Sequence, residues 1–431
     1  MKLERGSEPN AALSYVDIIT AETQGDRSVQ IYPTGRHPLS CIIGKPDACV
    51  NATGLISAIY SCIGSSACAY SVELDTGFKS CFGYEACYNV TAVSVGDRAC
   101  VGYHPCKDMG NVGVGIGSCT DEDACVRTIN TNIGHDSCVG YESCEDVTIS
   151  SIGDYSCHET ESCEEMFNST VGEGSCHGDD SCAEVTNSSI GDLACHGEYA
   201  CDESIEILVG TGSCRGYDAC EEALYSAIGS EACIGYEACQ DAMNMKIGDF
   251  SCHGEESCYY IFNSTVGTDS CYGYESCYQV TDSILGNDLS CKGEYSCRYA
   301  SRLEIAGTSC VGMNACEEAT DSVIGSISCI GHEKACYELN NTIVGNNACF
   351  GESACAGMSN SFVGDNACRC VGCCANCTGV YIPDGNCTGD IEKCSLCLDD
   401  DTLSPSASSM MPSGSSMYPT VWRSSEAPTH W

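Results

Sequence analysis

Carboxylates recur in pairs along the central part of the sequence, at intervals that repeat. Ten of them closely follow the second cysteine of six successive cysteine pairs: Glu145, Asp146, Glu164, Glu165, Glu184, Asp202, Glu203, Glu221, Glu222 and Asp241. Carboxylate oxygens are the ligands that Ca²⁺ prefers, because this ion takes six to eight oxygens in a flexible geometry. We therefore name these ten residues the acidic stripe and consider it a candidate calcium site. The alternative is a solvated acidic surface that holds no cofactor.

The cysteine pairs are the second feature whose residue types and spacing could do chemistry. From Cys62 to Cys271 the leading cysteines recur with a constant 19-residue period, and most have a partner at the sixth position after them. Such a pair could form a disulfide within its unit, join the same position of the next unit, or bind a metal as thiolates. The spacing favours the first interpretation, because zinc sites prefer other cysteine spacings. The pairs we single out are Cys81 with Cys87, Cys100 with Cys106, Cys233 with Cys239, and Cys252 with Cys258.

The 19-residue period indicates a solenoid, in which each unit buries its apolar face only against its neighbours. We number the unit from its first cysteine. Position 15 is almost always Ile, Val or Leu, position 13 is small or aliphatic, and positions 12 and 14 are mostly polar, which is the alternation of a β-strand. Glycines at positions 3 and 16 predict corners. We expect an all-β parallel β-helix of about 17 disulfide-clipped coils, about 80 Å long at the usual strand spacing.

The chain divides into four segments by composition. Residues 1–40 form a lead without the apolar core of a signal peptide, which we interpret as an incomplete N-terminus or a mature fragment. Residues 41–367 form the β-solenoid, and residues 368–398 form a cysteine-rich cap, for which a metal cluster is the alternative. Residues 399–431, rich in Ser, Pro and Thr, are expected to be a disordered tail. The given chain contains no apolar run long enough to span a membrane.

Charge and cysteine content restrict the compartment and the partners. The 431 residues include 61 Asp and Glu against 18 Lys and Arg, a net charge of -43, which excludes nucleic acid as a partner. The 42 cysteines fit an oxidising, extracellular location. Sequons at Asn168, Asn187 and Asn263 fall on position 12, which we expect to face outwards, so we predict a secreted glycoprotein.

Three further positions repeat chemically useful side chains and should form columns along the solenoid. The carboxylate column at position 5 comprises Glu85, Asp123, Glu142, Glu161, Asp180, Asp218, Glu237, Glu256 and Glu275. The tyrosine column at position 4 comprises Tyr84, Tyr103, Tyr141, Tyr217, Tyr236 and Tyr274. The histidine column at position 2 comprises His158, His177, His196 and, further along, His253. The tyrosines suit ladder stacking or sugar rings, and the histidines suit a solvated surface or a transition metal.

Residues 41–367 resemble the cysteine-rich repeats of secreted proteins from diatoms and related algae. The resemblance rests on units of the form SCxGxxACxxxxxSxIG, followed by a Ser/Pro-rich tail. It implies a right-handed parallel β-helix and a secreted protein, and it implies almost nothing about function.

The sequence contains none of the common catalytic motifs. There is no H-E-x-x-H, G-x-S-x-G or P-loop pattern, and the coils are too uniform to supply the long loops that line the clefts of β-helical enzymes. We therefore predict a non-catalytic extracellular structural or adhesive rod of a cell wall or matrix, with extracellular polysaccharide or matrix proteins as partners. The alternatives are a polysaccharide- or calcium-binding module and, more distantly, an enzyme acting on polysaccharide.

Overall fold

The computed structural model describes most of the expected solenoid. The described residues are 47–388, with gaps at 59, 145–146, 149–150, 164–166, 169, 183, 188, 202–204, 207, 221–223, 225–226, 240–242, 260, 280, 283 and 287–288. The lead (1–40), the tail (399–431) and the last part of the expected cap (389–398) lie outside the described residues.

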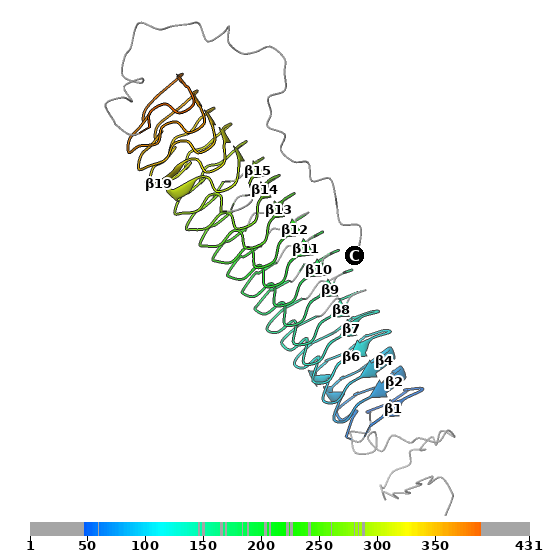
Figure 1. The fold of residues 1–431 in the computed structure, drawn as a ribbon. Helices are drawn as coiled ribbons and strands as arrows, with labels where there is room; N and C mark the ends of the chain where they lie inside the picture. Colours follow the sequence, from blue (N-terminus) through cyan, green and yellow to red (C-terminus); the bar gives the residue numbers. More distant parts are fainter. Residues whose placement is uncertain are drawn as a thin grey trace, which may run out of the picture.

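The described chain forms a long rod of stacked coils that progresses regularly from one end to the other (Figure 1). All strand pairings are parallel, and one 18-stranded sheet runs along the rod, accompanied by the two-stranded sheets β3–β5 and β17–β19. The expected all-β parallel solenoid is confirmed. No helix of the described part is long and apolar enough to cross a membrane.

The strands are β1 (Ile56–Ser57), β2 (Val72–Thr76), β3 (Phe82–Tyr84), β4 (Thr91–Val95), β5 (Val101–Tyr103), β6 (Gly113–Val114), β7 (Asn132–Ile133), β8 (Ser151–Ile152), β9 (Thr170–Val171), β10 (Ser189–Ile190), β11 (Leu208–Val209), β12 (Ala227–Ile228), β13 (Lys246–Ile247), β14 (Thr265–Val266), β15 (Ile284–Leu285), β16 (Glu304–Ile305), β17 (Val311–Met313), β18 (Val323–Ile324), β19 (Ile330–Glu333), β20 (Ile343–Val344), β21 (Phe362–Val363) and β22 (Tyr381–Ile382).

The register of the large sheet follows the sequence period. Ser189 in β10 pairs with Leu208 in β11, which holds the same position one period later. The step is longer by one residue between β15 and β16, and again between β18 and β20, where Val323 pairs with Ile343. These two longer steps accommodate one-residue insertions, so the sheet stays in register and every unit position remains stacked on its counterpart.

Alternation along the strands separates the core from the surface as expected. In β4, Val93 and Val95 are buried while Ser94 between them is exposed. In β14, Thr265 is exposed and Val266 is buried. Position 15 therefore supplies the aliphatic row of a narrow core, and position 14 forms the outer face of the sheet.

Glycine is required at positions 3 and 16 for different reasons. Gly83 at position 3 has φ +145°, and a Cβ there would collide with the carbonyl oxygen of Gly102 in the next coil. Gly248 at position 16 lacks a positive φ, but a Cβ would lie 2.5 Å from the backbone nitrogen of Thr268. Glycine is thus required at position 3 because of both the positive φ and the close approach of the next coil. At position 16 the close approach alone requires it.

Non-glycine residues also adopt the left-handed backbone region, which the sequence did not lead us to expect. Cys233 has φ 53° and Cys239 has φ 64°, and the same holds for Glu237 between them. This region costs a non-glycine residue about 1–2 kcal/mol. Hydrogen bonds between coils offset that cost, since the Cys233 amide donates to the Ser251 carbonyl at 2.9 Å and Cys239 donates to Ser257 at 3.1 Å.

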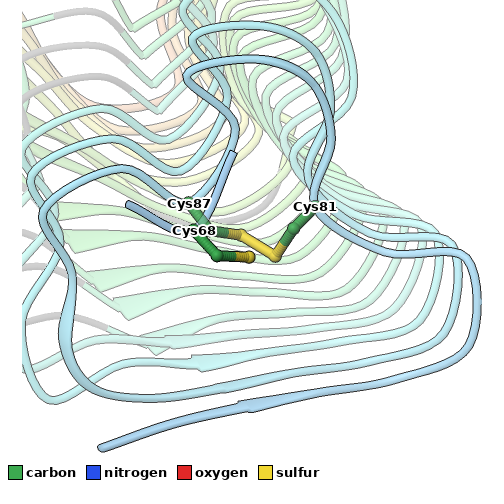
Figure 2. Close-up of side chains that lie close together, drawn as sticks. All are labelled: Cys68, Cys81 and Cys87. Carbon is green, nitrogen blue, oxygen red and sulfur yellow. A yellow bond between two sulfur atoms is a disulfide. The ribbon is translucent and has the colours of Figure 1, made fainter. Parts of the chain in front are cut away.

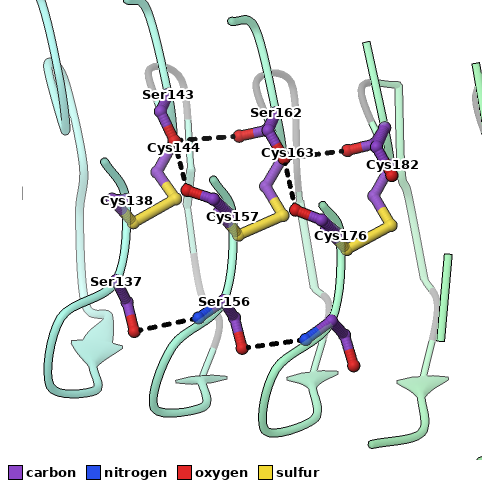
Figure 3. The surroundings of a disulfide bond; sticks show 12 residues. Ser137, Cys138, Ser143, Cys144, Ser156, Cys157, Ser162, Cys163, Cys176 and Cys182 are labelled. Carbon is purple, nitrogen blue, oxygen red and sulfur yellow. Dashed lines mark hydrogen bonds between the residues drawn. A yellow bond between two sulfur atoms is a disulfide. The ribbon is translucent and has the colours of Figure 1, made fainter. Parts of the chain in front are cut away.

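Rows of buried serines line the core beside the cysteines (Figure 3). At position 19, the Ser137 hydroxyl donates to the Gly153 carbonyl at 2.7 Å and accepts the Ser156 amide at 3.3 Å. At position 6, the Ser143 hydroxyl donates to the Cys157 carbonyl at 2.7 Å. Ser137 therefore satisfies a carbonyl and an amide at a corner. Ser143 adds a second hydrogen bond to the Cys157 carbonyl, which also accepts the Val139 amide.

The solenoid continues into the segment that we expected to form a cap. Cys368 and Cys374 form the usual disulfide, and β22 adds to the edge of the sheet beside β21. Residues 368–388 therefore have the geometry of a further coil.

We predict that Gly235→Ala destabilises the rod, whereas Gly110→Ala does not. Gly235 has φ +147°, and an added Cβ would meet the carbonyl oxygen of Gly254, while nothing lies within 4 Å of a Cβ on Gly110. Denaturant unfolding with the disulfides intact should show a loss of about 2 kcal/mol or more for the first variant. Equal stability of the two variants would contradict the close stacking of the coils.

Candidate functional site

A disulfide within each coil closes its corner. This is the first of the three alternatives for the cysteine pairs, a bond between two cysteines of the same unit. All four predicted pairs are confirmed, with Cα–Cα distances of 5.5 or 5.6 Å: Cys81–Cys87, Cys100–Cys106, Cys233–Cys239 and Cys252–Cys258. Thirteen further coils have the equivalent bond. Between Cys62 and Cys368 each leading cysteine thus bonds its own partner, so the alternative of disulfides between coils is wrong there.

The stacked disulfides bring sulfur atoms of neighbouring coils close together. The sulfur atoms of Cys68, Cys81 and Cys87 lie within 4.8 Å of one another. Figure 2 shows these three side chains close together. However, Cys81 is bonded to Cys87, and Cys68 is bonded to Cys62. Because a metal needs free thiolates, these sulfur rows do not form a metal centre while the disulfides are intact.

The cysteines at the start of the expected cap are oxidised as well. Cys368 is bonded to Cys374, and Cys377 is also disulfide-bonded. A metal cluster among the other cysteines of this segment stays an untested alternative.

The acidic stripe lies almost entirely outside the described residues. Glu184 is the exception, and its side chain is exposed. The calcium hypothesis for the stripe stays a prediction.

The carboxylate column at position 5 is described throughout, and its members are held partly buried at one corner. Glu161 and Asp180 lie in adjacent coils and are close enough for a shared hydrogen bond. This bond, followed by burial, raises the pKa of Glu161 above its ordinary value. Burial, followed by the charge of Glu275, raises the pKa of Glu256 in the same way. The column therefore concentrates negative charge that a proton or a cation would relieve.

At the N-terminal end of the column, a lysine already neutralises Glu85. The Lys107 ammonium lies 2.8 Å from a Glu85 oxygen, and His104 contacts both Glu85 and Asp123. Burial alone raises the pKa of Glu85, but the hydrogen bond and charge of Lys107 outweigh it and hold that pKa below its ordinary value.

A buried ion cluster interrupts the column towards the C-terminal end. Arg298 lies between Glu275 of the preceding coil, at 2.5 Å, and Glu317 of the following coil, at 3.1 Å. The rings of Tyr295 and Tyr299 flank its guanidinium, with centroids 4.9 and 4.8 Å from Cζ. Both glutamates are buried, so the cluster joins three coils by charge. Sequence reasoning missed it because its members occupy different unit positions.

The tyrosine column forms short stacks and not one continuous ladder. Tyr84 stacks on Tyr103 with centroids 5.0 Å apart, and Tyr217 stacks on Tyr236 at 5.4 Å. All four rings are exposed. Ladder stacking, one of the two interpretations of this column, is therefore present in short stretches. Contact of the exposed rings with sugars stays a prediction.

The histidine column also stacks, with centroids 4.7 and 4.9 Å apart for His158, His177 and His196. The Nε2 atom of each ring bonds a backbone carbonyl of the preceding coil, as between His158 and Asp136 at 2.6 Å. Parallel rings with one nitrogen engaged in this way cannot converge on one metal ion, so a shared transition metal is not supported.

The three candidate glycosylation asparagines are placed as expected. Asn168, Asn187 and Asn263 are exposed at position 12 on the outer face of the rod. The described geometry leaves room for glycans there, and their presence stays a prediction.

Comparison with known families identifies the repeat. A family described as a domain of unknown function (DUF7640) matches residues 39–110, 60–181, 174–286 and 274–392. The chain belongs to this family. The four DUF7640 matches overlap and each covers several coils, as a repeat with a 19-residue period requires. No curated protein and no solved structure matches the chain. Membership of the DUF7640 family supports the repeat, while kinship with secreted algal proteins stays a prediction.

We predict that Tyr141 ionises far above the ordinary range for tyrosine. Its hydrogen bond to the Glu142 carboxylate, assisted by the charge of that group, raises the pKa of Tyr141 from 10.0 to about 12. The difference in ultraviolet absorbance between the native protein and Tyr141→Phe should therefore titrate near pH 12. Glu142→Gln should return this transition towards pH 10, and a transition near pH 10 in the native protein would contradict the contact.

Proposed function

We propose that the protein is a non-catalytic extracellular rod with a structural or adhesive role in a cell wall or matrix. The observation that carries this proposal is the unbroken stack of coils, each closed by its own buried disulfide. In a solenoid each coil contacts only its neighbours, so every added coil lengthens the rod and repeats the same contacts. Disulfides inside the coils also limit how far any coil can unravel under load.

The disulfides support the extracellular part of the proposal. Seventeen clipped coils require an oxidising environment, which intracellular thiol buffers do not provide. The exposed sequon asparagines fit secretion. We extend these observations to a secreted, glycosylated protein of the wall or matrix.

Repetition supports the adhesive part of the proposal. A contact that one coil makes weakly can be repeated along the rod, and linked weak contacts give strong overall attachment. The stacked, exposed pair of Tyr217 and Tyr236 is of the kind that packs against sugar rings. Extracellular polysaccharide is therefore the partner we favour, with matrix proteins as the alternative.

One observation favours calcium binding as a second candidate function. Glu161 and Asp180 face each other closely enough to raise the pKa of Glu161, and neither has a basic partner among the described ion pairs. A divalent cation would relieve this repulsion. On this candidate the carboxylate column and the acidic stripe would bind Ca²⁺ together.

We predict that the purified protein co-sediments with insoluble extracellular polysaccharide. Tyr217→Ser combined with Tyr236→Ser should weaken binding about tenfold, because loss of two stacked rings removes about 1.4 kcal/mol or more. Tyr155→Ser is the matched control, since Tyr155 is exposed but lies outside the tyrosine column. Failure of the native protein to bind polysaccharide or matrix protein, together with its absence from the wall fraction of the producing cells, would contradict the proposal.

We predict that millimolar Ca²⁺ raises the melting temperature of the intact protein, if calcium bridges the carboxylates, and that the same concentration of Mg²⁺ raises it less. Two variants locate the effect. Glu161→Gln with Asp180→Asn removes a pair from the carboxylate column, and Glu164→Gln with Glu165→Gln removes a pair from the acidic stripe. A melting temperature that calcium leaves unchanged would eliminate this second function without affecting the first.

A further inference from the structure

A groove of about 430 Å³ lies at the N-terminal end of the rod, remote from the carboxylate-rich middle coils. It is lined by Tyr60, Ile63, Lys79, Phe82, Arg98 and Val101. Two of these side chains carry positive charge, and the other four present aromatic or aliphatic surface.

Two rows of the repeat build the groove. Ile63, Phe82 and Val101 occupy position 2 of three successive coils and pair with one another across the coils. Tyr60, Lys79 and Arg98 lie opposite, at position 18, each with a left-handed backbone. The first row forms an apolar floor, and the second row supplies the cations along one wall.

The same two rows run on along the rod, but elsewhere side chains bridge them. His158 at position 2 reaches the carbonyl of Asp136 at position 18. His177 and His253 bond the carbonyls of Tyr155 and Glu231 in the same way. Phe82 and Val101 have no polar atom with which to make this bond. In this groove position 2 is apolar and leaves the two rows unbridged, whereas the histidines bridge them further along the rod.

The apolar side chains of the groove are exposed enough to contact a ligand. Phe82 is 48 % exposed and Tyr60 is 49 % exposed. Concave apolar surface with a few polar groups at its edge is the usual form of a small-molecule site.

The two cations are unusual for this protein. Lys79 and Arg98 are exposed, adjacent coils place them one above the other, and neither forms an ion pair among the described residues. By contrast, residues 128–270 contain 28 Asp and Glu against two Lys and Arg. At the N-terminal groove Lys79 and Arg98 therefore supply local positive charge, which the carboxylate-rich middle coils lack.

We propose that this groove binds a small organic anion with an apolar body, such as an aromatic or medium-chain carboxylate or sulfonate. The apolar body would lie on Phe82, Ile63 and Val101, and the anionic group would lie between Lys79 and Arg98. Charge complementarity favours an anion over a neutral sugar, because only the anion is attracted by the positive charges of Lys79 and Arg98. The site goes beyond the proposed rod function and does not depend on it.

The test uses the intact protein and the anionic probe 8-anilinonaphthalene-1-sulfonate, with uncharged N-phenyl-1-naphthylamine as the comparison. We expect saturable binding of one anionic probe per chain, at least tenfold weaker binding of the uncharged probe, and weaker binding at high salt. Lys79→Ser combined with Arg98→Ser should weaken binding of the anionic probe at least tenfold. The matched control is Arg215→Ser, because Arg215 is an exposed basic residue at position 2 outside the groove.

Unchanged unfolding curves would establish that the variants fold, and Phe82→Ser offers a second variant that tests the floor of the groove independently. The proposal would be overturned by absence of probe binding, by equal affinity for both probes, or by unchanged affinity in the Lys79/Arg98 variant. It would also be overturned if sedimentation showed that the groove joins two copies of the chain, with dissociation in that variant.

Discussion

Parallel hydrogen bonding between coils is the constraint on which the rest of this structure depends. Amides of one coil donate to carbonyls of the next along the sheet and also at corners, as from Cys100 to Ser118 and from Cys81 to Ala99. Because each coil advances the chain by one sequence period, each side chain stacks on the residue that holds the same position in the next coil. The tight stacking explains why glycine is needed at position 3, where the next coil leaves no space for a Cβ.

The same constraint leaves room for only a thin core. Aliphatic side chains at position 15 and at position 10, such as Val147 and Ile261, fill it together with the cysteine rows and small Ser or Ala residues. The buried hydroxyls bond backbone carbonyls between coils. Several corner residues, including both cysteines of a pair, adopt a left-handed backbone to follow this geometry. The disulfide across each corner holds that conformation in place, so the cysteines act as part of the core.

Much of this organisation could be predicted from the sequence, because a period is visible without knowledge of contacts. The inward rows, the outward rows and the pairing of Cys233 with Cys239 all follow from one repeated pattern. Features that combine different unit positions could not be predicted in this way. The Arg298 cluster joins positions 5 and 8 of three coils, and the groove joins positions 2 and 18. The left-handed cysteines were also missed, since the residue type most often associated with positive φ is glycine.

The central claim is that each coil is closed by its own disulfide, since the left-handed corners and the proposed oxidising compartment both depend on it. The most direct measurement is mass-spectrometric peptide mapping of the native, unreduced protein after thiol blocking. The account predicts cross-linked peptides in which Cys157 is joined to Cys163, Cys176 to Cys182 and so on along the rod, without blocked thiols at these positions. Links between equivalent cysteines of neighbouring coils, or free thiols throughout the repeat, would contradict it.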